Sequence, residues 1–184
     1  LGDVYKRQNY LSPTYLNKVA ERFAKAENIE IFQNPEKILE AGDKLFIQGY
    51  GSNDYNNYPY PVVLFDPTTK TYKEIGKGVY MAEHDDIVYV IYSETNYADN
   101  TSTHTLYSYN AKTNEKVEKA FVQMPEKLKT SIITMLSINP ENGDFYIGAG
   151  DYTTNGDIYR FKKDGTFIEK FECGIDPKAA VFID

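Results

Sequence analysis

The 184-residue sequence has no tryptophan, a single cysteine and two histidines. One cysteine excludes an internal disulfide and any metal site built from several cysteines, so we expect Cys173 to be a small buried apolar residue. His84 and His104 fit no metal-ligand spacing, and we expect both on the surface or in loops. No Gly-x-Ser-x-Gly motif is present to hold a nucleophile. The sequence therefore predicts no catalytic residue, no metal ion and no cofactor.

Long apolar runs and an excess of positive charge are also missing. No run approaches the roughly 18 apolar residues that a membrane-spanning helix needs, so no such helix is predicted. With 20 basic and 27 acidic residues, the formal net charge is −7, which argues against a nucleic-acid partner. Charges of both signs mix over residues 116–129, which we interpret as a solvated face. What the sequence has in excess is tyrosine, with 17 residues beside 10 phenylalanines.

The first 27 residues of the chain differ in pattern from the rest of the sequence. Residues 1–8, LGDVYKRQ, resemble the translation of an adapter used in sequencing libraries, and we expect them to have no structural role. We therefore expect residues 9–184 to be part of a longer protein. Over residues 12–27 two patterns disagree. The apolar spacing predicts a helix, but residues 14–23 nearly repeat residues 113–121, which we interpret as a strand, and we favour the strand.

The rest of the sequence repeats a set of short strand-like segments three times, each rich in β-branched and aromatic residues. In chain order the segments are 35–39, 43–47, 61–66 and 70–75; 78–82, 86–90, 105–110 and 115–121; and 131–138, 143–147, 157–162 and 166–171. Turn-forming pairs such as Asp66-Pro67 and Asp164-Gly165 separate them. The repeat length is roughly 43 to 57 residues.

Four short antiparallel strands at such a period are typical of a β-propeller blade. We predict an all-β fold, a β-propeller fragment of about three to four blades, each a four-stranded antiparallel sheet. Blades are expected at residues 28–76, 77–122 and 123–172, with a closing strand at 175–183. That last segment repeats the pattern of residues 34–38, so that Asn34-Pro35 corresponds to Asp176-Pro177.

Residues 138–147, 155–161 and 164–165, together with the ending at 173–182, carry a resemblance to a known family. They resemble the YncE-like β-propellers, above all the surface-layer-type propellers of gut anaerobes. Members of this family commonly close about seven blades, so the resemblance implies that this chain is the C-terminal half of a ring. It also implies an extracytoplasmic location, in the periplasm or at the outer-membrane surface. A lipid-anchored parent protein and an outer-membrane transporter as partner are further implications.

The resemblance also bears on the ligand. A relative in this group captures cobalamin at the cell surface, so a cobalamin-like nutrient is a ligand that the resemblance implies. No motif in the sequence identifies a corrinoid site.

The loops between the second and third strands of the repeats, at residues 50–60, 93–103 and 151–156, are rich in tyrosine and asparagine. In a propeller these equivalent loops emerge at one face, and such a composition is typical of binding loops, because tyrosine offers a large rigid contact surface and asparagine adaptable hydrogen bonding. The candidate ligand-binding residues are Tyr50, Asn53, Tyr55, Asn57, Tyr58, Tyr60, Asn96, Tyr97, Asp99, Asp151, Tyr152 and Asn155. The alternative is that Asn, Asp and Gly only form turns there and that tyrosine pads the loop edges.

Aspartates in and beside these loops have the oxygen ligands that calcium prefers. They are Asp54, Asp99, Asp151 and Asp157. Because no Asp-x-Asp-x-Asp-Gly loop is present, we favour turn formation for all of them.

These observations favour a noncatalytic binding module that captures a small molecule or a protein partner through its Tyr- and Asn-rich loops. Two alternatives stay open: a lactonase- or lyase-type propeller enzyme with a site in the central channel, and a cell-surface scaffold or adhesion protein. A channel enzyme needs carboxylates or histidines from several inner strands, and the candidate inner strands here are mostly apolar or small.

Overall fold

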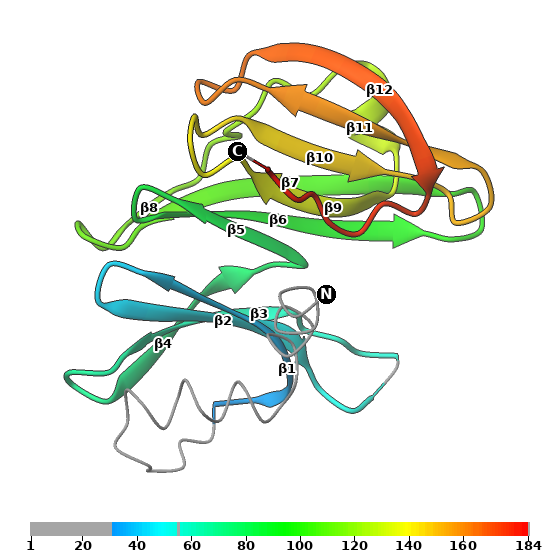
Figure 1. The fold of residues 1–184 in the computed structure, drawn as a ribbon. Helices are drawn as coiled ribbons and strands as arrows, with labels where there is room; N and C mark the ends of the chain where they lie inside the picture. The colour runs from blue at the N-terminus through cyan, green and yellow to red at the C-terminus, as the bar shows by residue number, and fades with distance from the viewer. Residues whose placement is uncertain (1–30, 55, 184) are drawn as a thin grey trace, which may run out of the picture. The chain divides into compact units, whose positions relative to one another are not determined.

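The structure, a computed structural model, describes residues 31–54 and 56–183. Within these residues lie twelve β-strands and one short helix (Figure 1), which confirms the prediction of an all-β fold. The chain divides into two compact units, Leu1–Lys77 and Gly78–Asp184, each of which is considered by itself. The proposed adapter residues 1–8 and the ambiguous segment 12–27 lie outside the described residues.

The first unit contains one antiparallel sheet in the order β1-β2-β3-β4. Its strands are β1 (Gln33–Ala41), β2 (Lys44–Gly51), β3 (Pro61–Asp66) and β4 (Thr71–Lys77). The second of the two central strands, β3, matches the predicted strand 61–66 to the residue. Leu45, Ile47 and Phe65 form a buried cluster on this sheet, and each side chain of that size contributes about 1.5–3 kcal/mol when buried.

The second unit contains two four-stranded antiparallel sheets, in the orders β5-β6-β7-β8 and β9-β10-β11-β12. The strands are β5 (Tyr80–His84), β6 (Ile87–Asn96), β7 (Thr101–Asn110), β8 (Glu115–Val117), β9 (Ile133–Ile138), β10 (Phe145–Ala149), β11 (Asn155–Phe161) and β12 (Phe167–Ile175). Both sheets contribute to a single core, whose buried members are Ala82, Ile91, Leu106, Val122, Leu128, Ile133, Leu136, Phe145, Ile147, Ala149, Tyr159 and Phe161. Because they share this core, the two sheets stabilise each other.

The strand β8 is shorter than the sequence predicts. It ends at Val117, whereas the repeat predicts a strand over 115–121. The reason lies in Phe121, whose ring centroid is 5.1 Å from that of Tyr89 and 5.2 Å from that of Phe145. The chain therefore leaves the sheet after Val117 and places Phe121 against the core, which buries more aromatic surface than an outer strand would.

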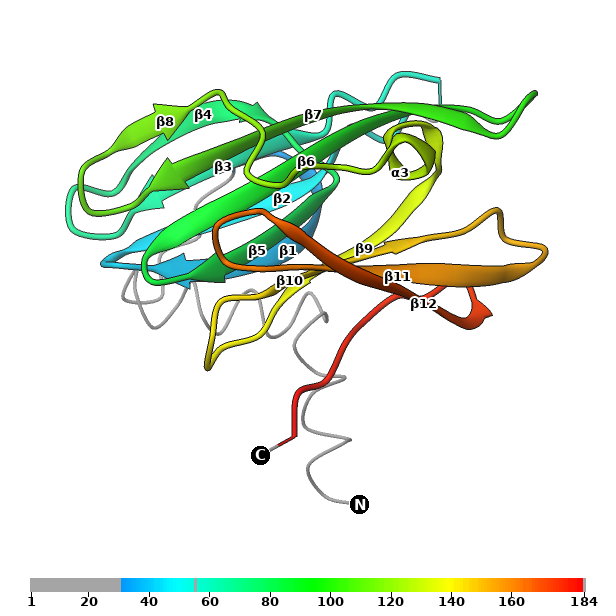
Figure 2. The ribbon, with the colours of Figure 1, turned by 90° about the horizontal axis from the view of Figure 1, so that it is seen from above.

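The five-residue helix α3 (Glu126–Thr130) is absent from the sequence prediction. It contacts β7, near which Figure 2 shows it, and its Leu128 side chain is completely buried. Val122 is also buried, so the interpretation of residues 116–129 as a solvated face is wrong at these two positions. No helix in the described part of the chain is long and apolar enough to cross a membrane.

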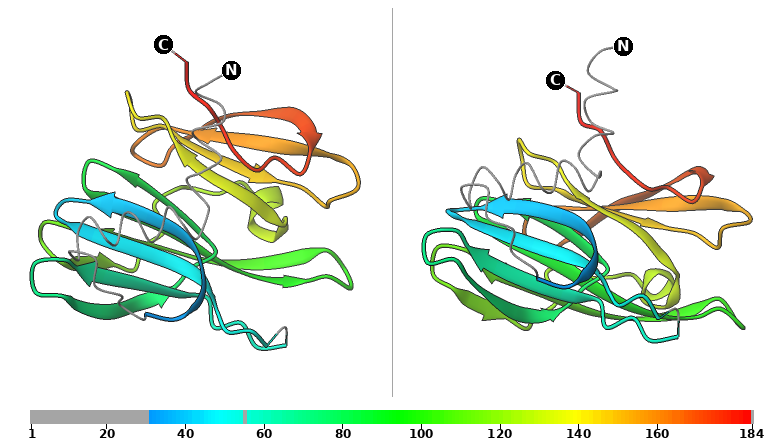
Figure 3. Two further views of the ribbon diagram at one scale, coloured as in Figure 1. Left: turned by 60° about the horizontal axis from the view of Figure 1, so that its bottom comes forward. Right: turned by 90° about the horizontal axis from the view of Figure 1, so that it is seen from below.

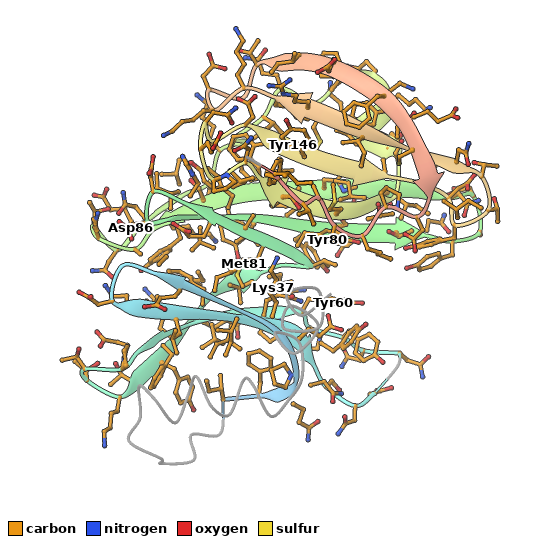
Figure 4. The ribbon with its side chains drawn as sticks, viewed as in Figure 1. Lys37, Tyr60, Tyr80, Met81, Asp86 and Tyr146 are labelled. Carbon is orange, nitrogen blue, oxygen red and sulfur yellow. The ribbon has the colours of Figure 1, made fainter. Side chains whose placement is uncertain are left out.

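Residues 177–183 have no regular secondary structure, whereas the repeat predicts a closing strand at 175–183. After β12 the segment turns back (red in Figure 3) and crosses the face of its own sheet. A Cβ on Gly156 would lie only 2.8 Å from Pro177 Cδ, and the ring of Phe182 lies 5.1 Å from that of Tyr146, which Figure 4 labels. A segment that crosses a sheet face has no neighbouring strand with which to form a ladder.

The backbone at the start of this segment repeats an earlier one. Asn34 and Asp176 both have left-handed backbone, with φ of 52° and 54°, and a proline follows each. Pre-proline residues favour extended backbone, and Asn and Asp tolerate the left-handed region better than most residues do. The correspondence between Asn34-Pro35 and Asp176-Pro177 in the sequence is therefore also a correspondence in conformation.

Candidate functional site

Two of the three Tyr- and Asn-rich loops belong to the second unit, and the structure brings them together. The turn between β6 and β7 carries Tyr97, and the loop between β10 and β11 carries Tyr152. Tyr97 is one of the groups that raise the pKa of Tyr152, so the two phenols lie near each other. They are nevertheless exposed, Tyr97 at 70% and Tyr152 at 42%. Together they present a tyrosine pair to solvent.

A cavity of about 140 Å³ lies beside these loops. Its lining residues come from the β6–β7 turn, from α3 and the segment before β9, and from the β10–β11 region: Asn100, Lys127, Ser131, Ile132, Ala149, Gly150, Asp151, Thr154, Asn155 and Asp157. Only Asp151 and Asn155 of the predicted site residues are among them. Lys127 and Ser131 escaped prediction because the sequence gives no signal that α3 approaches the loops.

A three-residue ionic group lies at this cavity. The Asp157 carboxylate lies 2.9 Å from Lys127 Nζ and 2.8 Å from Lys170 Nζ, and its side chain is only 14% exposed. Burial alone raises the pKa of Asp157, but the hydrogen bonds from Lys170 and Lys127 outweigh it and hold that pKa below its usual range. The same contact raises the pKa of Lys127. Asp157 and Lys127 are therefore charged at neutral pH, and the aspartate links α3 to β11 and β12.

Asp151 shapes the β10–β11 loop. Its carboxylate accepts hydrogen bonds from the backbone N–H and the hydroxyl of Thr153 at 2.9 and 3.0 Å, and from those of Thr154 at 2.7 and 2.9 Å. These four donors hold the pKa of Asp151 far below its usual range, with the backbone N–H of Thr154 the largest cause. The interpretation of Asp151 as a turn-forming residue fits this geometry.

The other predicted polar residues of the second unit also bond internally. Asn96 Nδ2 donates to Asp99 Oδ2 at 3.0 Å, and Asp99 Oδ1 accepts from the backbone and hydroxyl of Thr101. Asn155 Nδ2 donates to Glu172 Oε1 at 2.9 Å. No group of three or more His, Cys, Asp or Glu side chains within residues 31–54 and 56–183 is placed to hold a metal ion.

Tyr152 also contacts the C-terminal segment. Lys178 Nζ lies 5.4 Å from its ring centroid and 3.0 Å from the Asp176 carboxylate. Burial is the main cause that raises the pKa of Tyr152, followed by the neighbouring Tyr97 and Asp176. The phenol therefore stays protonated well above neutral pH, with its orientation fixed from two sides.

The third loop lies in the first unit, where three of the predicted residues pack against one another. Ring centroids are 4.6 Å apart for Tyr50 and Tyr58, 5.8 Å for Tyr50 and Tyr60, and 5.7 Å for Tyr58 and Tyr60 (Tyr60 is labelled in Figure 4). The negative charge of the neighbouring Glu36 is the largest cause of a raised Tyr50 pKa. This half-buried aromatic cluster resembles loop padding more than the exposed pair of the second unit does.

The remaining predicted residues of this loop hold its shape. Asn53 Oδ1 accepts from Asn34 Nδ2 at 2.6 Å, and the Asn57 backbone N–H donates to the Asp54 carbonyl at 3.0 Å. Tyr55 lies outside the described residues.

The histidines and the cysteine differ from expectation. His104 lies within β7, where its ring bridges Ser93 Oγ at 2.9 Å and the Ser131 carbonyl at 3.0 Å, and burial lowers its pKa. The His84 side chain, at the end of β5, is only 11% exposed. Cys173 is partly exposed rather than buried, because it lies on β12, an edge strand of its sheet.

Comparisons with known proteins bear on the fold alone. A scan of protein-family models finds no match, and neither does a search of curated protein sequences. Among solved structures, the chain is similar to the β-propeller domain of the Trilobed protease from Pyrococcus furiosus, described as having an open velcro topology, with a TM-score of 0.52 and 13% sequence identity. The similarity covers 78% of this chain and 43% of that one. The predicted fold class is thereby confirmed: the three sheets form part of a β-propeller of several blades.

Proposed function

We propose that the chain is a noncatalytic binding part of a β-propeller, which captures a small molecule or a partner at the loops that carry Tyr97 and Tyr152. The observation that supports this most is the pair of exposed tyrosines on two loops that also line a polar cavity. Large rings fixed before binding lose little entropy when a ligand contacts them. The internal pairing of Lys127 with Asp157 and the bridging of His104 support binding rather than catalysis, because neither arrangement leaves a poised acid or base.

The location and the biological partner rest on the sequence resemblance. We propose a YncE-like propeller of the surface-layer type that works outside the cytoplasm, on a lipid-anchored parent protein, and passes its ligand to an outer-membrane transporter. Among ligands, the resemblance favours a cobalamin-like nutrient.

Affinity selection with mass spectrometry tests the binding function. The purified chain is incubated with a mixture of small polar compounds that includes cyanocobalamin, and retained compounds are compared between the wild type and the Tyr97→Ala/Tyr152→Ala variant. We expect retention of the bound compound to fall about tenfold, because each lost ring removes roughly 0.5–1.5 kcal/mol of contact.

Tyr72→Ala is the matched control, since Tyr72 is 54% exposed and lies on β4 of the first unit, so it belongs to neither of the two loops. It should retain ligand like the wild type. Retention that is equal in all three proteins would reject the proposal.

A further inference from the structure

The chemistry of the cavity narrows the ligand class, and this step rests on the proposed function. The cavity volume of about 140 Å³ is below the roughly 300–1,000 Å³ of pockets that enclose drug-sized ligands. It suits a single small ring or the end of a longer molecule, so on this point the cavity volume disagrees with the cobalamin-like nutrient that the resemblance favours, whose corrin ring it would not enclose.

The charges at the cavity balance. Lys127 and Lys170 oppose Asp157, and the carboxylate of Asp151 is satisfied by four donors of its own loop. Lys170 lies outside the lining, so an anionic ligand would meet two carboxylates and a cationic ligand would meet the ammonium group of Lys127. The lining therefore favours a neutral ligand.

The polar atoms of the lining offer both donors and acceptors. Thr154 Oγ1 donates to Asp151, and Ser131 Oγ donates to the Lys127 carbonyl at 2.7 Å, so both hydroxyl oxygens keep lone pairs as acceptors. Lys127 has three N–H bonds and its side chain is 70% exposed, so donors other than the one bonded to Asp157 face solvent. Hydroxyl groups, which donate and accept at once, complement such a mixed lining.

Two exposed tyrosines belong to the loops whose residues line the cavity. Tyr152 directly follows Asp151 of the lining, and Tyr97 shares the β6–β7 turn with Asn100. A ligand that fits both features has hydroxyl groups on its rim and a C–H face that lies on an aromatic ring. From this combination we infer that the site binds a neutral saccharide unit, with its hydroxyls in the cavity and its C–H face against the tyrosine pair.

Saturation-transfer NMR on the 184-residue chain tests the inference. The probes are the methyl glycosides of glucose, galactose, mannose and xylose, with glucosamine and the methyl glycoside of N-acetylneuraminic acid as charged counterparts. We expect transfer to the ring C–H protons of at least one neutral glycoside and weaker or no transfer to the charged sugars. Affinity should fall about three- to tenfold in Tyr97→Ala and in Tyr152→Ala, and stay at the wild-type value in Tyr72→Ala.

Two further measurements distinguish failure of the saccharide inference from failure of the binding function. Tyr152→Phe keeps the ring and loses the hydroxyl, so it should retain most of the affinity even if Tyr152→Ala is poorly folded by circular dichroism. Cyanocobalamin and the mixture of small polar compounds are measured in parallel. If these bind in a way that depends on Tyr97 and Tyr152 while no neutral glycoside does, the saccharide inference fails and the binding function stands. If no compound depends on the two tyrosines, both fail.

Discussion

Polar and aromatic residues divide the tasks in the loops of the second unit. The short polar side chains form hydrogen bonds within their own loops, as Asn96, Asp99 and Asp151 show. The side chains of Tyr97 and Tyr152 are exposed to solvent. The composition of the loops predicts both tasks, because short polar side chains form turns and tyrosine forms contact surfaces. Composition cannot predict that Tyr97 meets Tyr152, since that contact depends on how two sheets pack.

His104 gives a pH-dependent prediction at the residue scale. Burial lowers its pKa in the folded state below the ordinary value of about 6.5, so the unfolded chain binds the proton more tightly. The stability that neutral His104 contributes is present above that value and is lost as the pH falls below it, at no more than about 1.4 kcal/mol per pH unit. Urea unfolding of the wild type should therefore show a drop in the free energy of unfolding between about pH 7.5 and pH 5.5.

The His104→Gln variant provides the comparison. It keeps His84 and every carboxylate, so the difference between the two pH dependences belongs to His104 alone. An equal drop in both proteins would contradict a buried, neutral His104.

Elements were predictable where the local pattern and the tertiary environment agree. The central strand β3 coincides with its predicted bounds, since Val62 and Phe65 are buried within a run of β-branched and aromatic residues bounded by turns. The outer strand β8 was predicted too long, because Phe121 finds a better site in the core. The helix α3 was not predicted, because five residues form a stable helix only with tertiary contacts. No local sequence pattern indicates those contacts.

The helix α3 gives a prediction at the element scale. Leu128 is its only buried residue and is completely inaccessible, so Leu128→Ala should lower the free energy of unfolding by about 2–5 kcal/mol. Lys129→Ala, on the exposed side of the same helix, should change it by no more than about 0.5 kcal/mol. Denaturant unfolding measures both. Similar losses in the two variants would mean that α3 is held by its ends and not by its buried side chain.

At the scale of the whole molecule, the candidate site belongs to one unit. Every residue that lines the cavity lies between Gly78 and Asp184, and both sheets of that unit share one core. The repeat in the sequence predicts the sheets but not this grouping, since three similar segments give no sign of which neighbours share a core.

A separately expressed segment of residues 78–184 tests this grouping. We expect it to unfold in one cooperative thermal transition, because every described member of this core lies between Gly78 and Asp184. Circular dichroism measures the transition, and the same small-compound mixture measures binding. A gradual melt, or loss of all binding that the longer chain has, would show that the first unit completes the site.

The left-handed residues before Pro35 and Pro177 have a consequence for reading related sequences. Asp176 lies 142 positions after Asn34, which corresponds to three repeats of about 47 residues. Few residue types tolerate left-handed backbone before a proline, so Asn or Asp is expected at this position. An Asn-Pro or Asp-Pro with this backbone therefore marks the same point of the repeat at residues 34 and 176, whereas Asp66-Pro67 lies in a turn without left-handed backbone.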